Sequence, residues 1–294
     1  MMSNLPIAAI MYDFDKTLSP RDMQEYAFIP ELKMENDVFW DKCRQMIMDN
    51  KMDQILAYMY VMIREAKGKK LLNRNEFNKL GKSVQLFDGV ATWFHRIDQY
   101  ASKQDLAVEH YIISSGLKEI IEGTKIAKYF KAIYAAEFCY DESGSPVWPS
   151  MTVNYTSKTQ FLFRINKGVL DVTQNEALNE YTPENKRRIP FANMIYIGDG
   201  LTDVPCMKLT KSNGGHSIAV YQGERSTLVN RMLLQGRVDF VAPANYSKDS
   251  PMESIVFSIL DKIAAGTRTA ALKMVQMDEA DRMAKEKQEQ TKLP

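Results

Sequence analysis

Cysteine and histidine are both scarce in this chain, which has 294 residues and three of each. The cysteines, Cys43, Cys139 and Cys206, are odd in number and far apart, so the sequence predicts neither a disulfide framework nor a zinc site. The histidines also lack the short spacing of metal ligands, and we expect them to be ordinary surface or hydrogen-bonded residues. Because unpaired cysteines are typical of a reducing compartment, we expect a cytoplasmic protein.

An excess of charge and a long apolar segment are absent as well. The 38 lysines and arginines nearly balance the 37 aspartates and glutamates, and the formal net charge is +1. This balance gives no electrostatic reason to expect nucleic acid or a membrane as a partner. The first apolar run is short, is interrupted by Asp13 and follows no basic leader, so we expect no secretory signal and no transmembrane helix.

What the chain does contain is an apolar run that ends in two carboxylates. Residues 7–17 read Ile-Ala-Ala-Ile-Met-Tyr-Asp-Phe-Asp-Lys-Thr. The apolar part predicts a strand buried on both faces. Asp13 and Asp15 would then lie beyond its carboxyl end, where open α/β sheets bind their ligands. Because two carboxylates this close repel each other unless a cation joins them, the pair predicts a divalent metal and chemistry on an anion.

Two further apolar runs end in small or acidic residues. The first, 110–114, ends in Ser114, and Ser115 and Gly116 are expected to open a helix. The second, 194–197, is followed by Gly-Asp-Gly-Leu-Thr-Asp at 198–203. If these strands are parallel neighbours of the first, their polar ends meet at one edge of the sheet. We expect other strands at 132–139, 147–155, 217–220 and 239–241, with a hairpin turn at 141–146.

Each of these motifs has another interpretation when it is taken alone. Asp13 and Asp15 could be helix-cap or turn residues, Gly198-Asp-Gly is a common turn signal, and Ser114-Ser115 could simply start a helix. Their occurrence in one order, each after a buried strand, favours the joint interpretation as a site.

Residues 21–86 show apolar side chains at helical spacing and no alternation of the strand type. Methionines at this spacing are typical of core packing, and the alternative is an adaptable lining for varied ligands. We therefore predict an α/β fold, with a Rossmann-like parallel sheet flanked by helices and an inserted all-helical cap. Residues 1–20 and 87–265 would form the core, 21–86 the cap, and 266–294 a polar C-terminal helix or tail.

The ordered motifs over residues 5–245 resemble the haloacid dehalogenase superfamily, specifically its phosphoserine phosphatase-like branch, with a helical cap between the first and second motifs. The resemblance implies that Asp13 is the nucleophile that forms an aspartyl-phosphate. It implies that Asp15 is the general acid and then the base that activates water. A Mg²⁺ ion would be held by Asp13, the backbone carbonyl of Asp15 and Asp199, with Asp203 binding the metal or its water or orienting a lysine.

The resemblance also implies a group of phosphate-binding residues. Thr17, Ser114 and Ser115 would donate hydrogen bonds to the phosphoryl oxygens, and a lysine would neutralise Asp13. We favour Lys158 for this role, because it begins a predicted helix over 158–167, ended by Gly168, and helix N-termini suit phosphate. Lys186 is the main alternative, although it belongs to a Lys-Arg-Arg run typical of solvent-exposed segments. Residues 169–191 are expected to be a polar surface excursion.

The sequence therefore predicts a Mg²⁺-dependent phosphatase of small phosphorylated metabolites. Halide release is disfavoured because Asp15 is present where dehalogenases lack the second aspartate. The alternatives are a phosphotransferase that uses the same intermediate and a non-catalytic protein that binds phosphate ligands on the same scaffold. Neither the particular ester nor the oligomeric state follows from the sequence.

Overall fold

The computed structural model describes residues 5–68 and 73–290, with side chains through residue 284. Within these residues the predicted α/β fold is confirmed, as a sheet of seven strands in the order β4-β3-β2-β1-β5-β6-β7. All neighbouring strands run parallel except β4, which is antiparallel to β3. The strands are β1 (Ile7–Tyr12), β2 (Ala107–Leu117), β3 (Phe130–Tyr140), β4 (Pro146–Met151), β5 (Met194–Gly198), β6 (His216–Tyr221) and β7 (Phe240–Pro243).

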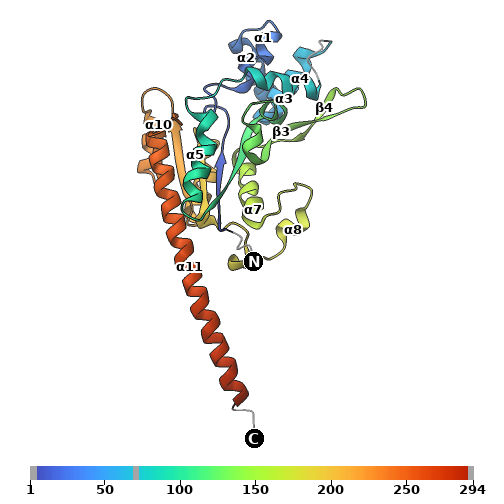
Figure 1. Cartoon of the computed structure of the whole chain (residues 1–294). Coiled ribbons are helices and arrows are strands. Elements are labelled where there is room, and N and C mark those ends of the chain that lie inside the picture. The colour runs from blue at the N-terminus through green and yellow to red at the C-terminus, as the bar shows by residue number, and fades with distance from the viewer. Residues whose placement is uncertain (1–4, 69–72, 291–294) are drawn as a thin grey trace.

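Helices cover both faces of the sheet (Figure 1). A helix that packs against the strands buries the side that faces them. The α-helices are α1 (Phe28–Glu31), α2 (Asn36–Asn50), α3 (Gln54–Ala66), α4 (Arg74–Leu80), α5 (Val90–Ser102), α6 (Lys118–Glu122), α7 (Thr159–Lys167), α8 (Asn175–Asn179), α9 (Val204–Ser212), α10 (Thr227–Leu234) and α11 (Pro251–Gln290). None of the described helices is both long enough and apolar enough to cross a membrane.

Strand β1 is central because its side chains are buried on both faces. Ala8, Ile10 and Tyr12 point to a core that they share with α5 and the first part of α11. Ala9 and Met11 point to a second core with α7, α9 and α10. Because successive side chains of a strand point to opposite faces, β1 packs against two separate layers of helices. This explains why its sequence is an unbroken apolar run.

The described residues between 21 and 86 form helices and no strand, as their spacing predicts. These helices lie together above the sheet, beside the β3–β4 hairpin (Figure 1). Phe28, Phe39 and Phe77 are fully buried in the same apolar cluster as Phe138 of β3, and the rings of Phe77 and Phe138 stack at 5.9 Å. The limits of the core, the cap and the C-terminal segment stay a prediction. Residues 1–4, 69–72 and 291–294 lie outside the described residues.

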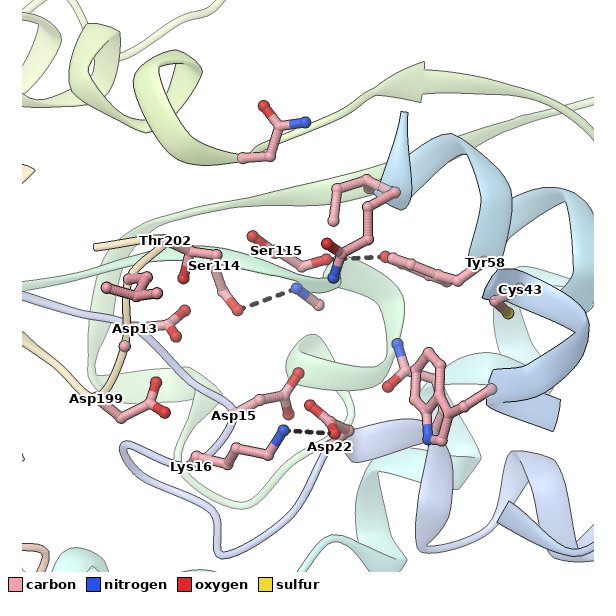
Figure 2. Close-up of a pocket in the computed structure, with 18 of the residues that line it drawn as sticks. Asp13, Asp15, Lys16, Asp22, Cys43, Tyr58, Ser114, Ser115, Asp199 and Thr202 are labelled. Atoms are coloured by element: carbon pink, nitrogen blue, oxygen red, sulfur yellow. Dashed lines mark hydrogen bonds and ion pairs between the residues drawn. The ribbon is translucent and has the colours of Figure 1, made fainter. Parts of the chain in front are cut away.

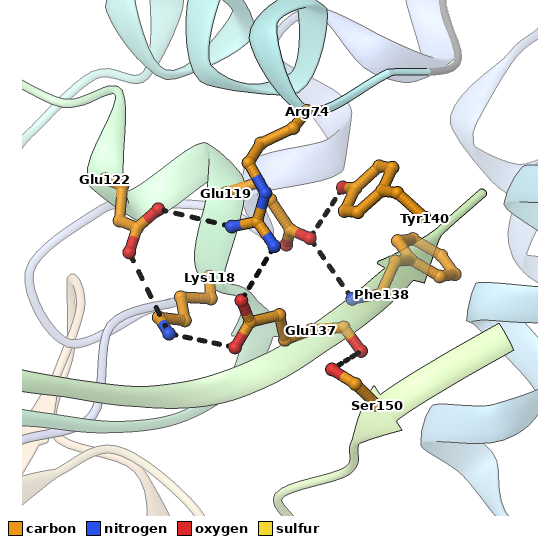
Figure 3. A network of polar contacts seen from close by, with 8 residues as sticks. All are labelled: Arg74, Lys118, Glu119, Glu122, Glu137, Phe138, Tyr140 and Ser150. Atoms are coloured by element: carbon orange, nitrogen blue, oxygen red, sulfur yellow. Dashed lines mark hydrogen bonds and ion pairs between the residues drawn. The ribbon is translucent and has the colours of Figure 1, made fainter. Parts of the chain in front are cut away.

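A network of polar contacts joins α4 to the sheet (Figure 3). Arg74 of α4 pairs with Glu137 of β3 at 2.9 Å, and Lys118 pairs with the other oxygen of Glu137 at 2.8 Å. Beside them the fully buried Glu119 accepts a hydrogen bond from the Tyr140 hydroxyl at 2.6 Å, and burial raises the pKa of Glu119. The network fixes the helical block to β3 at a point away from the carboxyl end of β1.

Helix α11 closes the fold and then continues beyond it. Met252, Val256 and Leu260 are fully buried against the sheet side, whereas the described side chains after Thr267 are exposed. Figure 1 shows this second part extending away from the rest of the molecule. Of the two forms we expected for residues 266–294, the structure has the helix, through Gln290.

Two local expectations are wrong. Residues 114–116 do not open a helix, because β2 continues to Leu117, which pairs with Ala136 after a register shift, and α6 begins at Lys118. The α-helix predicted over 158–167 does not begin at Lys158, because α7 starts at Thr159. A short 3-10 helix, Tyr155–Lys158, precedes α7, and Asn154 forms a capping box with Ser157 there. Helix α10 was not expected at all.

Candidate active site

A cavity of about 720 Å³ lies at the carboxyl ends of β1, β2 and β5, between the sheet and helices α2 and α3 (Figure 2). Asp13, Ser114 and Asp199, which come from or follow these three strands, all line it. Strand β1 lies between β2 and β5, where the order of the strands changes direction. Open α/β sheets bind ligands at such a switch point, so the topology itself locates a binding site here.

The first motif forms a tight turn after β1. The backbone N–H of Asp13 donates to the carbonyl of Ile197 at 2.9 Å, which holds this aspartate against β5. The carbonyl of Phe14 then accepts hydrogen bonds from the backbone of residues 17–19. Lys16 has a φ of 58°, which is uncommon for a residue other than glycine. Such conformations cluster at functional sites, and the Lys16 side chain pairs with Asp22 at 2.7 Å.

This turn directs Asp13 and Asp15 to different surroundings. Asp15 accepts a hydrogen bond from the backbone N–H of Met23 at 2.9 Å, at the start of the 3-10 helix η1 (Met23–Glu25). Burial raises the pKa of Asp15 well above its usual value, and the carboxylates of Asp22 and Asp13 raise it further. A raised pKa favours the protonated form of Asp15, which is the form that a general acid needs.

Asp13, Asp199 and Asp203 form an acidic group, and one ligand atom from each lies within 4.8 Å of the other two. Carboxylate oxygens at this spacing fit the hard, oxygen-preferring Mg²⁺ ion, which keeps several of its waters. The carboxylate of Asp15 is not part of this group, and the ligand that we expected from this residue is its backbone carbonyl.

Lys158 is fully buried between two of these carboxylates. Its Nζ lies 3.2 Å from Oδ1 of Asp13 and 2.7 Å from Oδ1 of Asp203, and the Tyr196 hydroxyl also donates to Asp203 at 2.8 Å. Burial opposes the positive charge, but Asp13 and Asp203 outweigh it and raise the pKa of Lys158. Lys186 is exposed on the 169–191 excursion. The structure therefore brings Lys158, and not Lys186, to Asp13.

Gly198, the last residue of β5, lets the backbone lie close to the side chain of Asp203. A Cβ at this position would lie 2.5 Å from Cγ of Asp203, so any other residue would displace that carboxylate. The N–H of Gly200 donates to the same carboxylate at 3.3 Å. The Gly-Asp-Gly segment is thus a turn, as its composition suggests, and its two glycines contact the Asp203 carboxylate of the acidic group.

The three hydroxyl residues predicted to bind phosphate are buried or half-buried near these groups. Ser114 and Ser115 line the cavity, whereas Thr17 does not. The hydroxyl of Ser114 accepts a hydrogen bond from the N–H of Gly116 at 3.1 Å. The hydroxyls of Thr17 and Ser115 are buried without a hydrogen-bond partner. Because buried polar groups are rarely left unpaired, the Ser115 hydroxyl, which lines the cavity, fits a site that receives an oxygen-rich ligand. The structure does not bring Thr17 to the cavity lining.

Comparison with known proteins gives the family. A model of the haloacid dehalogenase-like hydrolases matches residues 10–208, which is more than half of the chain. This chain is a haloacid dehalogenase-like hydrolase. An uncharacterised protein of Borreliella burgdorferi is 31% identical to it over 288 residues, which cover 86% of this chain and 98% of that protein.

Solved structures share the fold of this hydrolase at low sequence identity. A haloacid dehalogenase family hydrolase of Salmonella enterica serovar Typhi is 19% identical with a TM-score of 0.50, over 81% of this chain and 68% of that one. A probable phosphoserine phosphatase of Vibrio cholerae is 9% identical with a TM-score of 0.55, over 90% and 69%. At these identities the likeness shows a common architecture.

The acidic group predicts an unusual pH dependence for the metal-free hydrolase. Burial and neighbouring carboxylates raise the pKa of Asp199 from 3.8 to about 8, and burial raises that of Asp13 to about 6. In the unfolded chain both titrate near pH 4, so between about pH 4 and pH 8 the folded state binds more protons and stability falls as pH rises.

We therefore expect the melting temperature in chelator to decrease by several degrees between about pH 5 and pH 8. Saturating Mg²⁺ should remove most of this slope, because the ion binds the deprotonated carboxylates. Asp199→Asn, which removes the carboxyl group whose pKa is raised to about 8, should flatten the slope in chelator. A melting temperature in chelator that rises across this range would contradict the assignment.

Several residues of the site were not expected from the sequence. Tyr196 reads as an ordinary apolar strand residue, yet it donates to Asp203. Asp22 was not considered, although it pairs with Lys16 and lines the cavity. Helices α2 and α3 also contribute to the lining. No local pattern in a helical insert shows which of its residues line a cavity. These helical residues are Trp40, Cys43, Arg44, Ile47, Gln54, Ile55 and Tyr58.

Proposed function

We propose that this hydrolase is a Mg²⁺-dependent phosphatase that acts on a small phosphate monoester through an aspartyl-phosphate on Asp13. The observation that carries the proposal is the convergence of Lys158, Asp13 and the other two carboxylates at one edge of the sheet. Hydrolysis of phosphate monoesters is very slow in water, and a carboxylate nucleophile divides it into two easier steps. A cavity of about 720 Å³ suits a small metabolite.

In the first step an oxygen of Asp13 attacks phosphorus, and the bond from phosphorus to the ester oxygen breaks. Asp15 gives its proton to that oxygen as the alcohol leaves. General acid catalysis of this kind typically contributes ~10²–10⁴-fold. The raised pKa of Asp15 supports this role, because a carboxyl group must be protonated to donate.

In the second step the Asp15 carboxylate takes a proton from water, whose oxygen attacks phosphorus. The bond to Asp13 breaks and inorganic phosphate leaves, which restores both side chains. Lys158 offsets the negative charge of Asp13 throughout, and the hydroxyls of Ser115 and Ser114 hold phosphoryl oxygens, with Thr17 supporting the turn. When bound to Asp13, Asp199 and Asp203, Mg²⁺ would screen the anionic phosphoryl group.

We also propose that the hydrolase works in the cytoplasm. All three cysteines are free, and Cys43 and Cys206 are buried. Free thiols persist most readily in a reducing compartment.

Phosphate release from p-nitrophenyl phosphate tests the proposed function. We expect turnover with Mg²⁺, loss of turnover in chelator, and recovery when Mg²⁺ is restored. With added alcohols, phosphate released should still equal ester consumed. A shortfall matched by a new phosphate ester would instead identify a phosphotransferase. Absence of turnover on any phosphate monoester, with the ion bound, would support a non-catalytic binding protein.

A further inference from the structure

The lining of the cavity contains an unsatisfied amide. Gln24, in η1, lines the cavity, and its side chain is 2% exposed. Its amide oxygen Oε1 has no hydrogen-bond partner. Leaving such an acceptor buried and unpaired is unfavourable, so native proteins rarely keep one without a use. An acceptor of this kind beside a cavity points to a ligand that carries a donor.

The next residue, Glu25, presents an unbalanced charge to the same cavity. Its Oε1 accepts a hydrogen bond from the indole N–H of Trp40 at 2.8 Å, which orients the carboxylate. Among the ion pairs of the described residues, none includes Glu25, and this side chain is half-buried. A partly desolvated carboxylate without a counter-ion attracts a cation.

The cations that line the cavity are already paired. Lys16 is bound to Asp22 at 2.7 Å, and Arg44 is bound to Asp41. Lys158, which is not among the lining residues, is bound to Asp13. An additional carboxylate on a ligand would therefore meet these negative charges with no unpaired cation among the described residues that line the cavity, whereas a positive group would balance them.

We propose that the substrate is the phosphate monoester of a short amino alcohol without a carboxylate. Its protonated amine would donate to Oε1 of Gln24 and to the carboxylate of Glu25. A primary ammonium has three N–H donors, enough for both acceptors, whereas a hydroxyl has one and a quaternary ammonium has none. This inference rests on the proposed phosphatase function and assigns the leaving-group end of the same cavity.

The test compares substrates that differ only in the leaving group. We expect kcat/KM for 2-aminoethyl phosphate to exceed that for n-propyl phosphate, its uncharged isostere, by at least about 10-fold, because a site built for hydrogen bonds rejects analogues that lack them. Phosphocholine and phosphoserine should also be poorer than 2-aminoethyl phosphate. The first replaces the donors by methyl groups, and the second adds a carboxylate.

Two variants locate the selectivity. Glu25→Gln and Gln24→Met, which keeps the size of the side chain, should each reduce the ratio of 2-aminoethyl phosphate to n-propyl phosphate by about 10-fold or more. Glu35→Gln makes the same charge change on an exposed residue near the start of α2 and should keep the parent ratio.

The outcomes separate this inference from the proposed function. If the parent protein cleaves p-nitrophenyl phosphate but shows a ratio near one, the amine site is wrong and the phosphatase stands. If phosphoserine is the better substrate, the exclusion of a carboxylate is wrong. If no monoester is cleaved, both proposals fail. The comparison in the parent protein does not depend on whether a variant folds.

Discussion

Replacement of Asp13 by asparagine is expected to reduce kcat for p-nitrophenyl phosphate by at least about 10³-fold, because removing a nucleophile removes the covalent route. Asparagine has the same shape, but its amide is not a nucleophile. The fold should be retained, since the change also removes one of three carboxylates that repel each other in the absence of metal. Initial rates and melting temperature, measured on the same preparation, check both parts.

Asp199→Asn is the matched control for this loss. It removes a carboxylate from the same acidic group, but one that we assign to the metal and not to bond formation. Activity of Asp199→Asn should recover in part as the Mg²⁺ concentration is raised, whereas Asp13→Asn should stay inactive at every concentration. If Asp13→Asn recovers with Mg²⁺ to the parent rate, Asp13 only binds the ion.

Lys158→Met should both inactivate and destabilise the protein. The substitution keeps an unbranched side chain but leaves Asp13 and Asp203 buried without their cation. Removing one partner of a buried ion pair costs about 3–5 kcal/mol. The free energy of unfolding in chelator should fall by that amount near pH 8, and by less near pH 5, where the carboxylates can take up protons.

Lys186→Met tests which of the two candidate lysines acts at the site. Lys186 is exposed and has no ion pair among those of the described residues, so its replacement should change neither stability nor turnover measurably. Denaturant unfolding and phosphate release are compared for the two variants side by side. Loss of turnover in Lys186→Met with normal turnover in Lys158→Met would reverse our assignment.

The carboxyl ends of the strands could be predicted because their sequences obey a simple physical constraint. A parallel strand covered on both faces must be apolar along its whole length, as β1 and β5 are. A carboxylate or glycine directly after such a run therefore marks the edge of the sheet. This reasoning located Asp13, Ser114 and Asp199 before the structure did, and the parallel order of β2, β1 and β5 brings them together.

The remaining parts of the site depend on contacts between distant segments. Gln24 looks like any polar residue of a surface loop, and only the packing of the helical block above it makes it buried. Tyr196 acquires its role from a residue in the following turn. Strand β2 extends to Leu117 because this residue pairs with Ala136 of β3, a contact that the sequence of β2 alone does not specify.

The central claim is that a covalent bond forms between phosphorus and Asp13. Acid quenching during steady turnover of p-nitrophenyl phosphate, followed by borohydride reduction, converts an acyl phosphate on aspartate to homoserine, which peptide mass spectrometry can locate. We predict homoserine at position 13 and unmodified Asp15, Asp199 and Asp203. Homoserine at another aspartate, or none at all in an enzyme that is turning over, would contradict the account.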